Sequence, residues 1–535
     1  MKSTGDDKID TKRDDKHDDA IRPSVSAMGR RDLMKIGASL ALTTLGASKT
    51  VAQSSPPTPS VTPPFIQTST GYKNDANRSS GNGPMDATTQ QIVKWVSSFP
   101  ESDVTGPLAD SIGDVMIDSI AALISGFESE PARISARLAR TTRSDLKCTV
   151  LGYGVTTSPE MAAFANGCML RHTDFNDIGP IPEGALHLSD IISGILAIGE
   201  ALHSTGSQML AAIVVGYEVQ GALSAAGTSF GWDSPYEGVG VAMGVGKLMG
   251  MNEDQLANAL SLTLVPHMPL KVTHVGALSH WKGCHSPESA KCAVWATLMA
   301  KEGMTGPAQP FEARYGLWDF GGPFNKELKL PVGSSDGRMV VQRMGFKRTP
   351  SEGSSQAVLE VIPDFRAFAK AEDIAAIHIE MPFGGWQEIA DPPKWDPRNR
   401  ETADHSLPYI VARALIDGEI YLGSFTSEKF MDPEARRLMA NTTIAPNNNF
   451  TYMGQNRITM RTKAGKVMTK ETSVRIVTQM TRQELVAKFH RVCNFMHVTD
   501  DQRDRALAEW SDLRAVKDIA EPMRTLAKFG KPLPL

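Results

Sequence analysis

The strongest constraint on the fold of this chain is a long region in which apolar residues recur at helical spacing. Between Thr89 and about residue 345, such repeats occupy residues 115–124, 191–202, 210–217 and 290–299. The apolar positions cover several faces of each predicted helix, so these helices must pack against one another in layers. The sequence therefore predicts a large helical domain over residues 89–345.

The pattern changes in the second half of the chain. Apolar residues at alternate positions predict short strands near residues 375–381, 457–461 and 472–476. Helical spacing returns at residues 408–415, 432–439, 482–489 and 501–513. We therefore expect a mainly α fold with a second, smaller α+β domain over residues 346–500, followed by a C-terminal helical segment over residues 501–535.

Composition excludes several functional classes. The chain has 535 residues, of which 41% are apolar, so it can bury a large core. Its net charge of −4 shows no basic excess, and a nucleic-acid partner is therefore not expected. The five cysteines form no CxxC pair, which argues against zinc or iron–sulfur ligation. Small-molecule chemistry is the expected function.

The N-terminus has the pattern of an export signal. Arg30 and Arg31 precede the apolar run 36–47, and small residues end at Ala52. This order is typical of a twin-arginine signal over residues 1–53, followed by a flexible linker over residues 54–88. It predicts passage through the twin-arginine translocase and a periplasmic mature protein without stable membrane insertion. The alternatives are a cytosolic chain with a chance arginine pair and an uncleaved anchor.

A dense group of ionisable residues lies between two of the apolar helical patterns. The run RHTDFND at residues 171–177 is followed, after a Gly/Pro-rich loop, by HLSD at residues 187–190. A folding core does not require so many charged side chains in one short segment. We interpret this segment as part of a functional site.

Four separated motifs resemble the MmgE/PrpD family. They are AAFANG at residues 162–167 with RHTDFND and HLSD after it, SHWKGCH at residues 279–285, AKEGMTGP at residues 300–307 and ETADHSLPYIVARAL at residues 401–415. The resemblance covers roughly residues 89–515. It implies a helical domain with an α/β lid domain, a homodimer, and a site without metal or cofactor that takes di- or tricarboxylates. It also implies a lyase, most closely a 2-methylcitrate dehydratase.

The resemblance assigns roles to several residues. Asp174, His187 and Lys282 are the expected catalytic residues, with His187 as the proton carrier, Asp174 as base or as the group that orients it, and Lys282 as a cation for a substrate carboxylate. Lys347, His285, Arg171 and His405 are the expected substrate-binding residues. The alternatives are a capping or structural role for His187, a core position for His285 and surface positions for both lysines.

Some positions depart from the family pattern. Ser234 stands where many members have a histidine, Ile178 stands in place of a threonine, and residues 353–356 read GSSQ where the lid motif often contains a histidine. The site therefore has fewer proton carriers than is usual. An epimerase, isomerase or decarboxylase acting on a related acid, or a carboxylate-binding protein without catalysis, stays open as an alternative.

Overall fold

The computed structural model describes residues 83–179, 187–227, 231–333, 336–473, 479–532 and 534–535. These residues belong to one compact unit that spans residues 63–535. The expected export signal over residues 1–53 and most of the expected linker over residues 54–88 lie outside the described residues. The first helix, α1 (Ala87–Ser98), begins after Asp86, whose carboxylate accepts a hydrogen bond from the Thr89 N–H.

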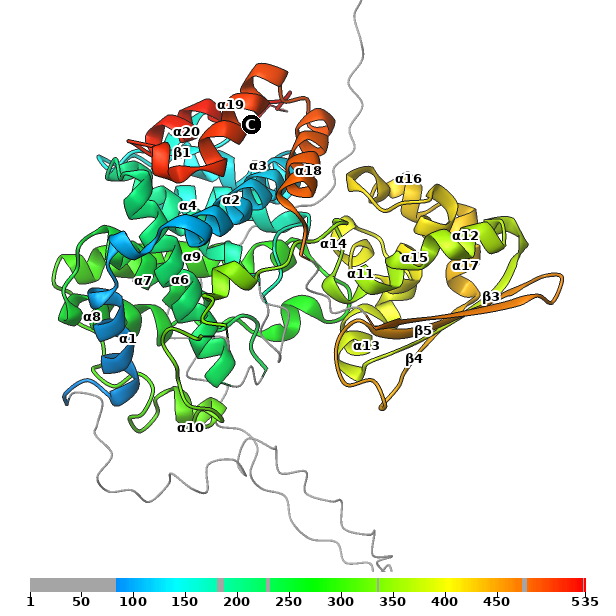
Figure 1. Cartoon of the computed structure of the whole chain (residues 1–535), viewed down its shortest axis with the longest axis horizontal. Coiled ribbons are helices and arrows are strands. Elements are labelled where there is room, and N and C mark those ends of the chain that lie inside the picture. Colours follow the sequence, from blue (N-terminus) through cyan, green and yellow to red (C-terminus); the bar gives the residue numbers. More distant parts are fainter. Residues whose placement is uncertain (1–82, 180–186, 228–230, 334–335, 474–478, 533) are drawn as a thin grey trace, which may run out of the picture. The chain divides into compact units, whose positions relative to one another are not determined.

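The first part of the chain is a layered assembly of helices (Figure 1). After α1 these are α2 (Gly106–Gly126), α3 (Glu130–Ala139), α4 (Pro159–His172), α5 (Ile192–Ala201), α6 (Gly206–Ala226), α7 (Glu237–Leu248), α8 (Glu253–Leu264), α9 (His285–Lys301) and the short α10 (Leu317–Gly321). A small hairpin of β1 (Cys148–Val150) and β2 (Val155–Thr157) lies between α3 and α4. Helices α2, α5, α6 and α7 are buried over most of their length, as their many-sided apolar pattern predicts.

Helices α6 and α7 pack closely because glycines face the contact. A Cβ atom on Gly240 would lie 2.9 Å from the carbonyl oxygen of Gly216, and one on Gly244 would lie 2.9 Å from that of Ala212. Among the described residues, α6 is the one helix long and apolar enough to cross a membrane, but 89% of its most apolar window is buried inside the protein. Burial of that kind is typical of a core helix.

The second part of the chain contains a four-stranded mixed sheet. Its strands are β3 (Ile374–Met381), β4 (Thr442–Pro446), β5 (Gln455–Thr462) and β6 (Val467–Ser473), in the order β4-β3-β5-β6. Strands β3 and β4 are parallel and the other pairs are antiparallel. Residues 456, 458, 460 and 462 of β5 are buried in alternation, which explains the period of two in the sequence.

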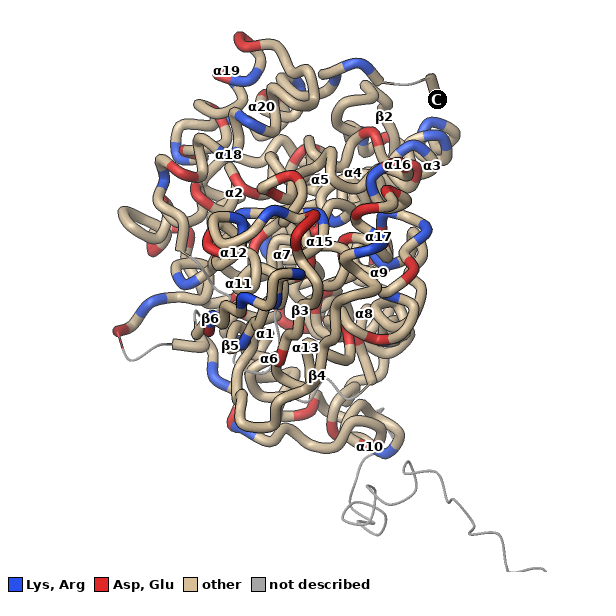
Figure 2. Tube along the Cα trace, turned by 90° about the vertical axis from the view of Figure 1, so that its right-hand side faces the viewer, with Lys and Arg blue, Asp and Glu red and all other residues tan. Residues whose placement is uncertain are grey.

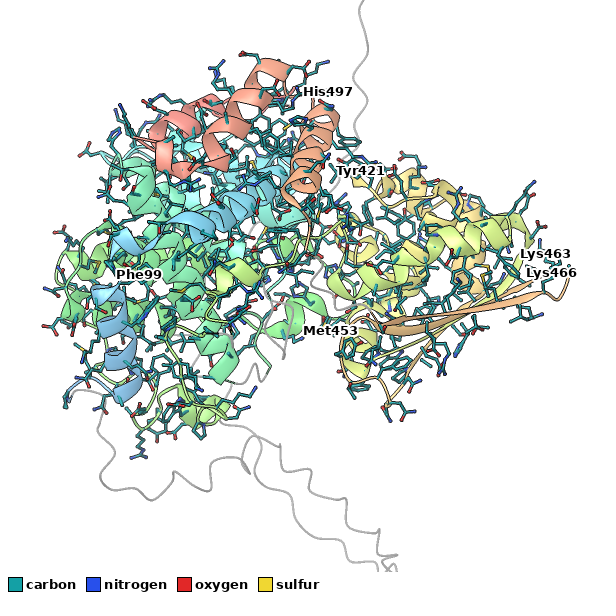
Figure 3. All side chains as sticks on the ribbon, in the orientation of Figure 1. Phe99, Tyr421, Met453, Lys463, Lys466 and His497 are labelled. Atoms are coloured by element: carbon teal, nitrogen blue, oxygen red, sulfur yellow. The ribbon has the colours of Figure 1, made fainter. Side chains whose placement is uncertain are left out.

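Several helices pack with this sheet around a hydrophobic core that is separate from the core of the helical part. They are α11 (Gly353–Glu360), α12 (Ile362–Phe368), α13 (Phe383–Ile389), α14 (Arg400–Ala403), α15 (Leu407–Asp417), α16 (Ser427–Phe430) and α17 (Pro433–Ala440). The turn between β5 and β6 carries Lys463 and Lys466, at the end of the hairpin away from the helical part (Figure 3). In Figure 2, acidic and basic residues are interspersed along the described chain, in keeping with a net charge of −4.

The C-terminal segment returns to the helical part. It begins before residue 501, the boundary that we expected, because α18 (Arg482–Phe495) already packs on α2. Helix α19 (Asp500–Ser511), which also packs on α2, and α20 (Ala520–Thr525) follow. Tyr421, which precedes α16 and is labelled in Figure 3, packs its ring 5.5 Å from that of Phe495 on α18. The expected fold class, mainly α with a smaller α+β domain, is confirmed.

Short 3₁₀ helices connect these elements and carry several residues of the site. They are η3 (Glu101–Asp103), η4 (Leu188–Ile191), η5 (Lys271–His274), η6 (His280–Gly283), η7 (Val340–Arg343), η8 (Ala371–Asp373), η9 (Pro392–Trp395), η10 (Leu422–Ser424) and η11 (Leu513–Ala515). Because such helices occur mainly as short connections, their positions were not visible in the apolar pattern.

Candidate active site

The C-terminal end of α4 directs an aspartate into the protein. The helix ends at His172, and two residues later Asp174 adopts a φ of 54°, in the left-handed region that a residue with a side chain rarely occupies. The side chain of Asp174 is 1% exposed. Strained backbone of this kind is often found at functional sites.

Two cations neutralise the buried Asp174. The Lys347 ammonium donates hydrogen bonds to Oδ2 at 2.6 Å and to the backbone oxygen of the same residue at 2.9 Å. Arg171 forms an ion pair with the other carboxylate oxygen. Burial alone would raise the pKa of Asp174, but the charges of Lys347 and Arg171 outweigh it and hold that pKa well below its usual range. Asp174 is therefore ionised.

His187 faces the same carboxylate as a neutral base. Its Nδ1 lies 2.5 Å from the carbonyl oxygen of Asp177, which can only accept, so Nδ1 carries the proton and Nε2 has the free lone pair. Nε2 lies 3.7 Å from Oδ1 of Asp174. Burial, and then the charges of Arg171 and Lys347, lower the pKa of His187 well below its usual value. The imidazole is uncharged at neutral pH and can accept a proton.

The rest of the RHTDFND run contacts η4, the 3₁₀ helix that directly follows His187. The Asp177 carboxylate accepts hydrogen bonds from the Ser189 N–H at 3.1 Å, the Ser189 hydroxyl at 2.7 Å and the Tyr217 hydroxyl at 3.0 Å. Asn176 donates to Asp190 at 2.8 Å. Burial raises the pKa of Asp177 to about 7. Asp177 and Asn176 therefore position the segment next to His187 and are not expected to react themselves.

Lys282 lies in a second buried ion pair. It is carried by η6, where Gly283 packs against the end of α4: a Cβ there would lie 3.1 Å from the Cα of His172. Its ammonium lies 3.0 and 3.1 Å from the two carboxylate oxygens of Asp404, and both side chains are 0% exposed. The alternative of a surface lysine is wrong for Lys282, and it is also wrong for Lys347, whose side chain is equally buried.

The Asp404 segment lies between two helices. Helix α14 ends at Ala403 and α15 begins at Leu407. Asp404 ends the first helix, and the Ser406 hydroxyl accepts a hydrogen bond from the backbone at the start of the second. His405 Nδ1 lies 2.8 Å from Oδ1 of Asp404. The break between the helices turns the carboxylate toward Lys282.

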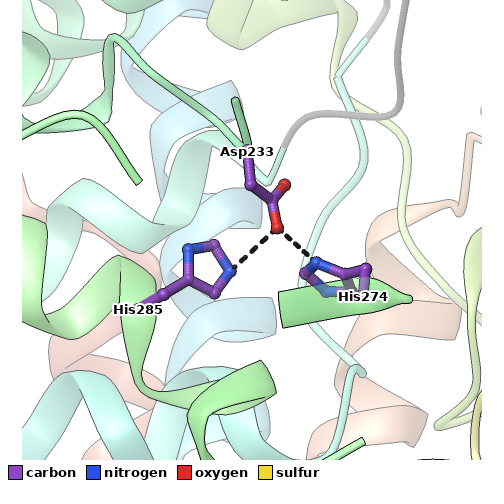
Figure 4. Close-up of side chains that lie close together, drawn as sticks. All are labelled: Asp233, His274 and His285. Atoms are coloured by element: carbon purple, nitrogen blue, oxygen red, sulfur yellow. Dashed lines mark hydrogen bonds and ion pairs between the residues drawn. The ribbon is translucent and has the colours of Figure 1, made fainter. Parts of the chain in front are cut away.

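His285 belongs to a third group, which contains two residues absent from the sequence prediction (Figure 4). Its Nε2 lies 3.5 Å from Oδ2 of Asp233, and the same carboxylate oxygen contacts His274 Nδ1. The ring of His274 lies 5.4 Å from that of His405, so the third group adjoins the second. Asp233 neighbours Ser234, the position that departs from the family pattern, but nothing in the sequence connects it with His274 forty-one residues away.

Two further residues support the site and were also not predicted. Lys488 of α18 donates to Asp118 at 2.6 Å and to the carbonyl oxygens of Phe175 and Lys347 at 2.7 and 3.0 Å. The Glu352 N–H donates to the carbonyl oxygen of Asp404 at 3.0 Å, and burial raises the pKa of Glu352 to about 8. Both residues join segments that are far apart in the sequence, which is why local patterns did not reveal them.

The predicted site residues thus fall into three groups. Arg171, Asp174, His187 and Lys347 form the first, Lys282 and His405 join Asp404 in the second, and His285 joins Asp233 and His274 in the third. The groups influence one another electrostatically, since Lys282 also lowers the pKa of Asp174 and Arg171 also lowers that of His285. The arrangement can hold an anionic ligand and move a proton.

Two family models match this chain. The MmgE/PrpD N-terminal domain matches residues 90–325, and the MmgE/PrpD C-terminal domain matches residues 350–513. The human protein named cis-aconitate decarboxylase is 25% identical over 377 residues, which are 66% of this chain and 75% of that protein. The Aspergillus terreus protein of the same name is 21% identical over 472 residues, 81% of this chain and 93% of that protein.

A dehydratase is also similar. The Salmonella typhimurium protein named 2-methylcitrate dehydratase is 28% identical over 296 residues, 51% of this chain and 60% of that protein. Both domains of one family match in order, and together they cover more than half of the chain. The chain belongs to the MmgE/PrpD family.

Proposed function

We propose that the chain is a lyase that removes water from a hydroxy di- or tricarboxylate. The observation that carries this proposal is the neutral His187 imidazole, whose Nε2 faces a carboxylate held between Lys347 and Arg171. The similarity to proteins named 2-methylcitrate dehydratase supports the reaction class.

His187 acts as the proton carrier in the proposed reaction. Its Nε2 accepts a proton from the carbon beside a substrate carboxylate, while the Nδ1–H contact with the Asp177 carbonyl keeps the ring in the required tautomer. Asp174 stabilises the imidazolium that forms. The carbon–oxygen bond then breaks, and the departing hydroxyl takes the proton back from His187. Water leaves, and the imidazole is neutral again.

The buried lysines supply positive charge for the substrate. Removal of a proton next to a carboxylate places negative charge on that group, and a preorganised cation in a dry site stabilises it more than water does. Lys347 and Lys282 already contact carboxylates of the protein. A substrate carboxylate would share these cations with Asp174 and Asp404.

Proton NMR in D₂O tests the reaction. The purified protein is incubated with a panel of hydroxy di- and tricarboxylates, and dehydration is expected to produce new olefinic signals that a His187→Gln variant does not produce. If well-folded protein binds these acids and leaves every one of them unchanged, the chain is a carboxylate-binding protein and the proposal is wrong.

Decarboxylation is the second candidate. The relatives named cis-aconitate decarboxylase match a larger share of this chain than the Salmonella dehydratase does. Loss of a carboxylate also leaves negative charge that the same lysines would stabilise. The NMR experiment separates the candidates, because decarboxylation gives the proton signals of an acid with one carboxylate fewer, whereas an epimerase exchanges the carbon-bound hydrogen for deuterium without forming an olefin.

We also propose that the protein is exported by the twin-arginine route and forms a homodimer. Replacing Arg30 and Arg31 by lysine is expected to keep the protein in the cytoplasm, as cell fractionation would measure. Sequencing of the exported protein is expected to begin near Gln53. Light scattering of the purified protein should give twice the mass of one chain; a monomer would contradict the dimer.

A further inference from the structure

Three side chains next to the proposed active site converge as metal ligands would. One oxygen of Asp233, one ring nitrogen of His274 and one of His285 all lie within 4.8 Å of one another. Figure 4 shows the two imidazoles on opposite sides of the carboxylate, each directed at the same oxygen. Two histidines and one carboxylate are a common donor set for zinc and for other divalent first-row metals.

The backbone holds two of these side chains in place. Residues 231–233 pair with residues 269–271: the Asp233 N–H donates to the Pro269 carbonyl at 2.9 Å and the Lys271 N–H donates to the Gly231 carbonyl at 3.0 Å. Helix η5 then begins at Lys271 and ends at His274. Asp233 and His274 are therefore presented by one local pairing. Ser234 follows at a φ of 48°, a strained conformation directly after the carboxylate.

His285 provides an independent indication of a ligand. It is the first residue of α9 and is 3% exposed, yet neither of its ring nitrogens makes a hydrogen bond to any of the described residues. A buried polar group without a hydrogen bond is costly, and native proteins rarely leave one so. Its Nε2 is aimed at Asp233 from 3.5 Å. A cation between the two would satisfy this nitrogen.

A neighbouring hydroxyl also orients the carboxylate. The Thr273 hydroxyl donates to Asp233 Oδ2 at 2.7 Å, the kind of contact that orients a ligating carboxylate.

We propose that Asp233, His274 and His285 bind one divalent first-row transition-metal ion such as Zn²⁺ or Co²⁺. The ion would replace the direct contact between Asp233 and His274, because ligand atoms lie about 2.0–2.2 Å from the metal and must separate to surround it. Three protein ligands leave at least one position for water or for a substrate oxygen. From the sequence we expected no metal site, because the cysteines form no CxxC pair and the family resemblance implies a site without metal.

Cobalt titration tests the proposal without reference to enzyme activity. The purified full chain is dialysed against a chelator, and Co²⁺ is added while its visible absorption is recorded. We expect one Co²⁺ per chain and displacement by Zn²⁺. Asp233→Asn and His285→Ala should each weaken binding at least about tenfold, since even second-shell changes cost about 10–100-fold.

Two further variants make the test decisive. Thr273→Val leaves all three ligands in place and should weaken binding by about 10–100-fold through the lost orientation of Asp233. His203→Ala is the matched control, because His203 pairs with Asp518 at 2.9 Å on the surface, and no third donor joins them among the described residues. This variant should bind Co²⁺ as the parent does. Equal uptake by the parent and by His285→Ala, or no uptake by a folded parent, would overturn the proposal.

Discussion

The two buried lysines of the site differ in what surrounds the aspartate that each contacts. Asp174, the partner of Lys347, has a strained backbone, a second cation in Arg171 and a neutral imidazole nearby. Asp404, the partner of Lys282, lies between two helices, with the His405 imidazole at 2.8 Å and Arg400 only at 4.0 Å. Among the described residues, two cations therefore contact the carboxylate closely in the first region, whereas in the second region Lys282 is the one cation that does. The two lysines are equally buried, so they differ in the groups that surround the aspartate each one contacts.

The largest expected effect comes from removing the base of the first region. His187→Gln should lower turnover by about 10²–10⁴, the usual contribution of a general base. Its stability should change little. The measurement is kcat/KM on the acid that the NMR panel identifies, with thermal unfolding as the check on folding. Activity within tenfold of the parent would assign the proton transfer to another residue, and His203→Gln serves as the exposed control.

The second prediction concerns the dependence of the Asp404 region on one cation. Lys282→Met should lower the free energy of unfolding by about 3–5 kcal/mol, because it leaves a buried carboxylate without its main partner. The double variant Lys282→Met/Asp404→Leu should recover most of this loss. Urea unfolding measures both. Lys370→Met is the control, since the Lys370 side chain is 81% exposed and its ion pair should contribute little.

The matching variant of the first region should have a smaller effect. Lys347→Met should lower the free energy of unfolding by about 1–3 kcal/mol, because Arg171 still contacts Asp174 after the ammonium is lost. The same urea experiment ranks the two lysines. A larger loss for Lys347→Met than for Lys282→Met would contradict the view that Arg171 shares the neutralisation of Asp174.

The last prediction is a change in pH dependence. Burial lowers the pKa of His405 to about 3, so below pH 6.5 the unfolded chain binds a proton there that the folded chain does not. Proton binding to His405 in the unfolded chain therefore lowers the free energy of unfolding as the pH falls from 6.5 toward 3. His405→Gln should make the fall shallower by about 1.4 kcal/mol per pH unit in that range. An unchanged slope in urea unfolding between pH 6.5 and 4.5 would show that His405 does not titrate as its burial requires.

The sequence predicted regular elements well because their patterns are local. The apolar repeat at residues 210–217 lies within α6, and the alternation at residues 457–461 lies within β5. The short β4 and the 3₁₀ helices escaped prediction, because they are too short for a period to be recognised. Arg171, Asp174 and His187 were found together because one segment carries all three. Asp233 and His274 were not predicted, because the residues around each of them in the sequence include no dense group of ionisable side chains.

By itself, the sequence determined the helical and α+β halves, the family and most of the ionisable residues of the site. Only the tertiary structure decided which of them meet: Lys347 contacts Asp174 across 173 residues, and Lys282 contacts Asp404 across 122. The physical reason is that burial patterns depend on neighbours three or four positions away, whereas Coulomb energy depends on distance in space. Folding brings those charges together, and the local spacing of apolar residues does not predict which charges meet.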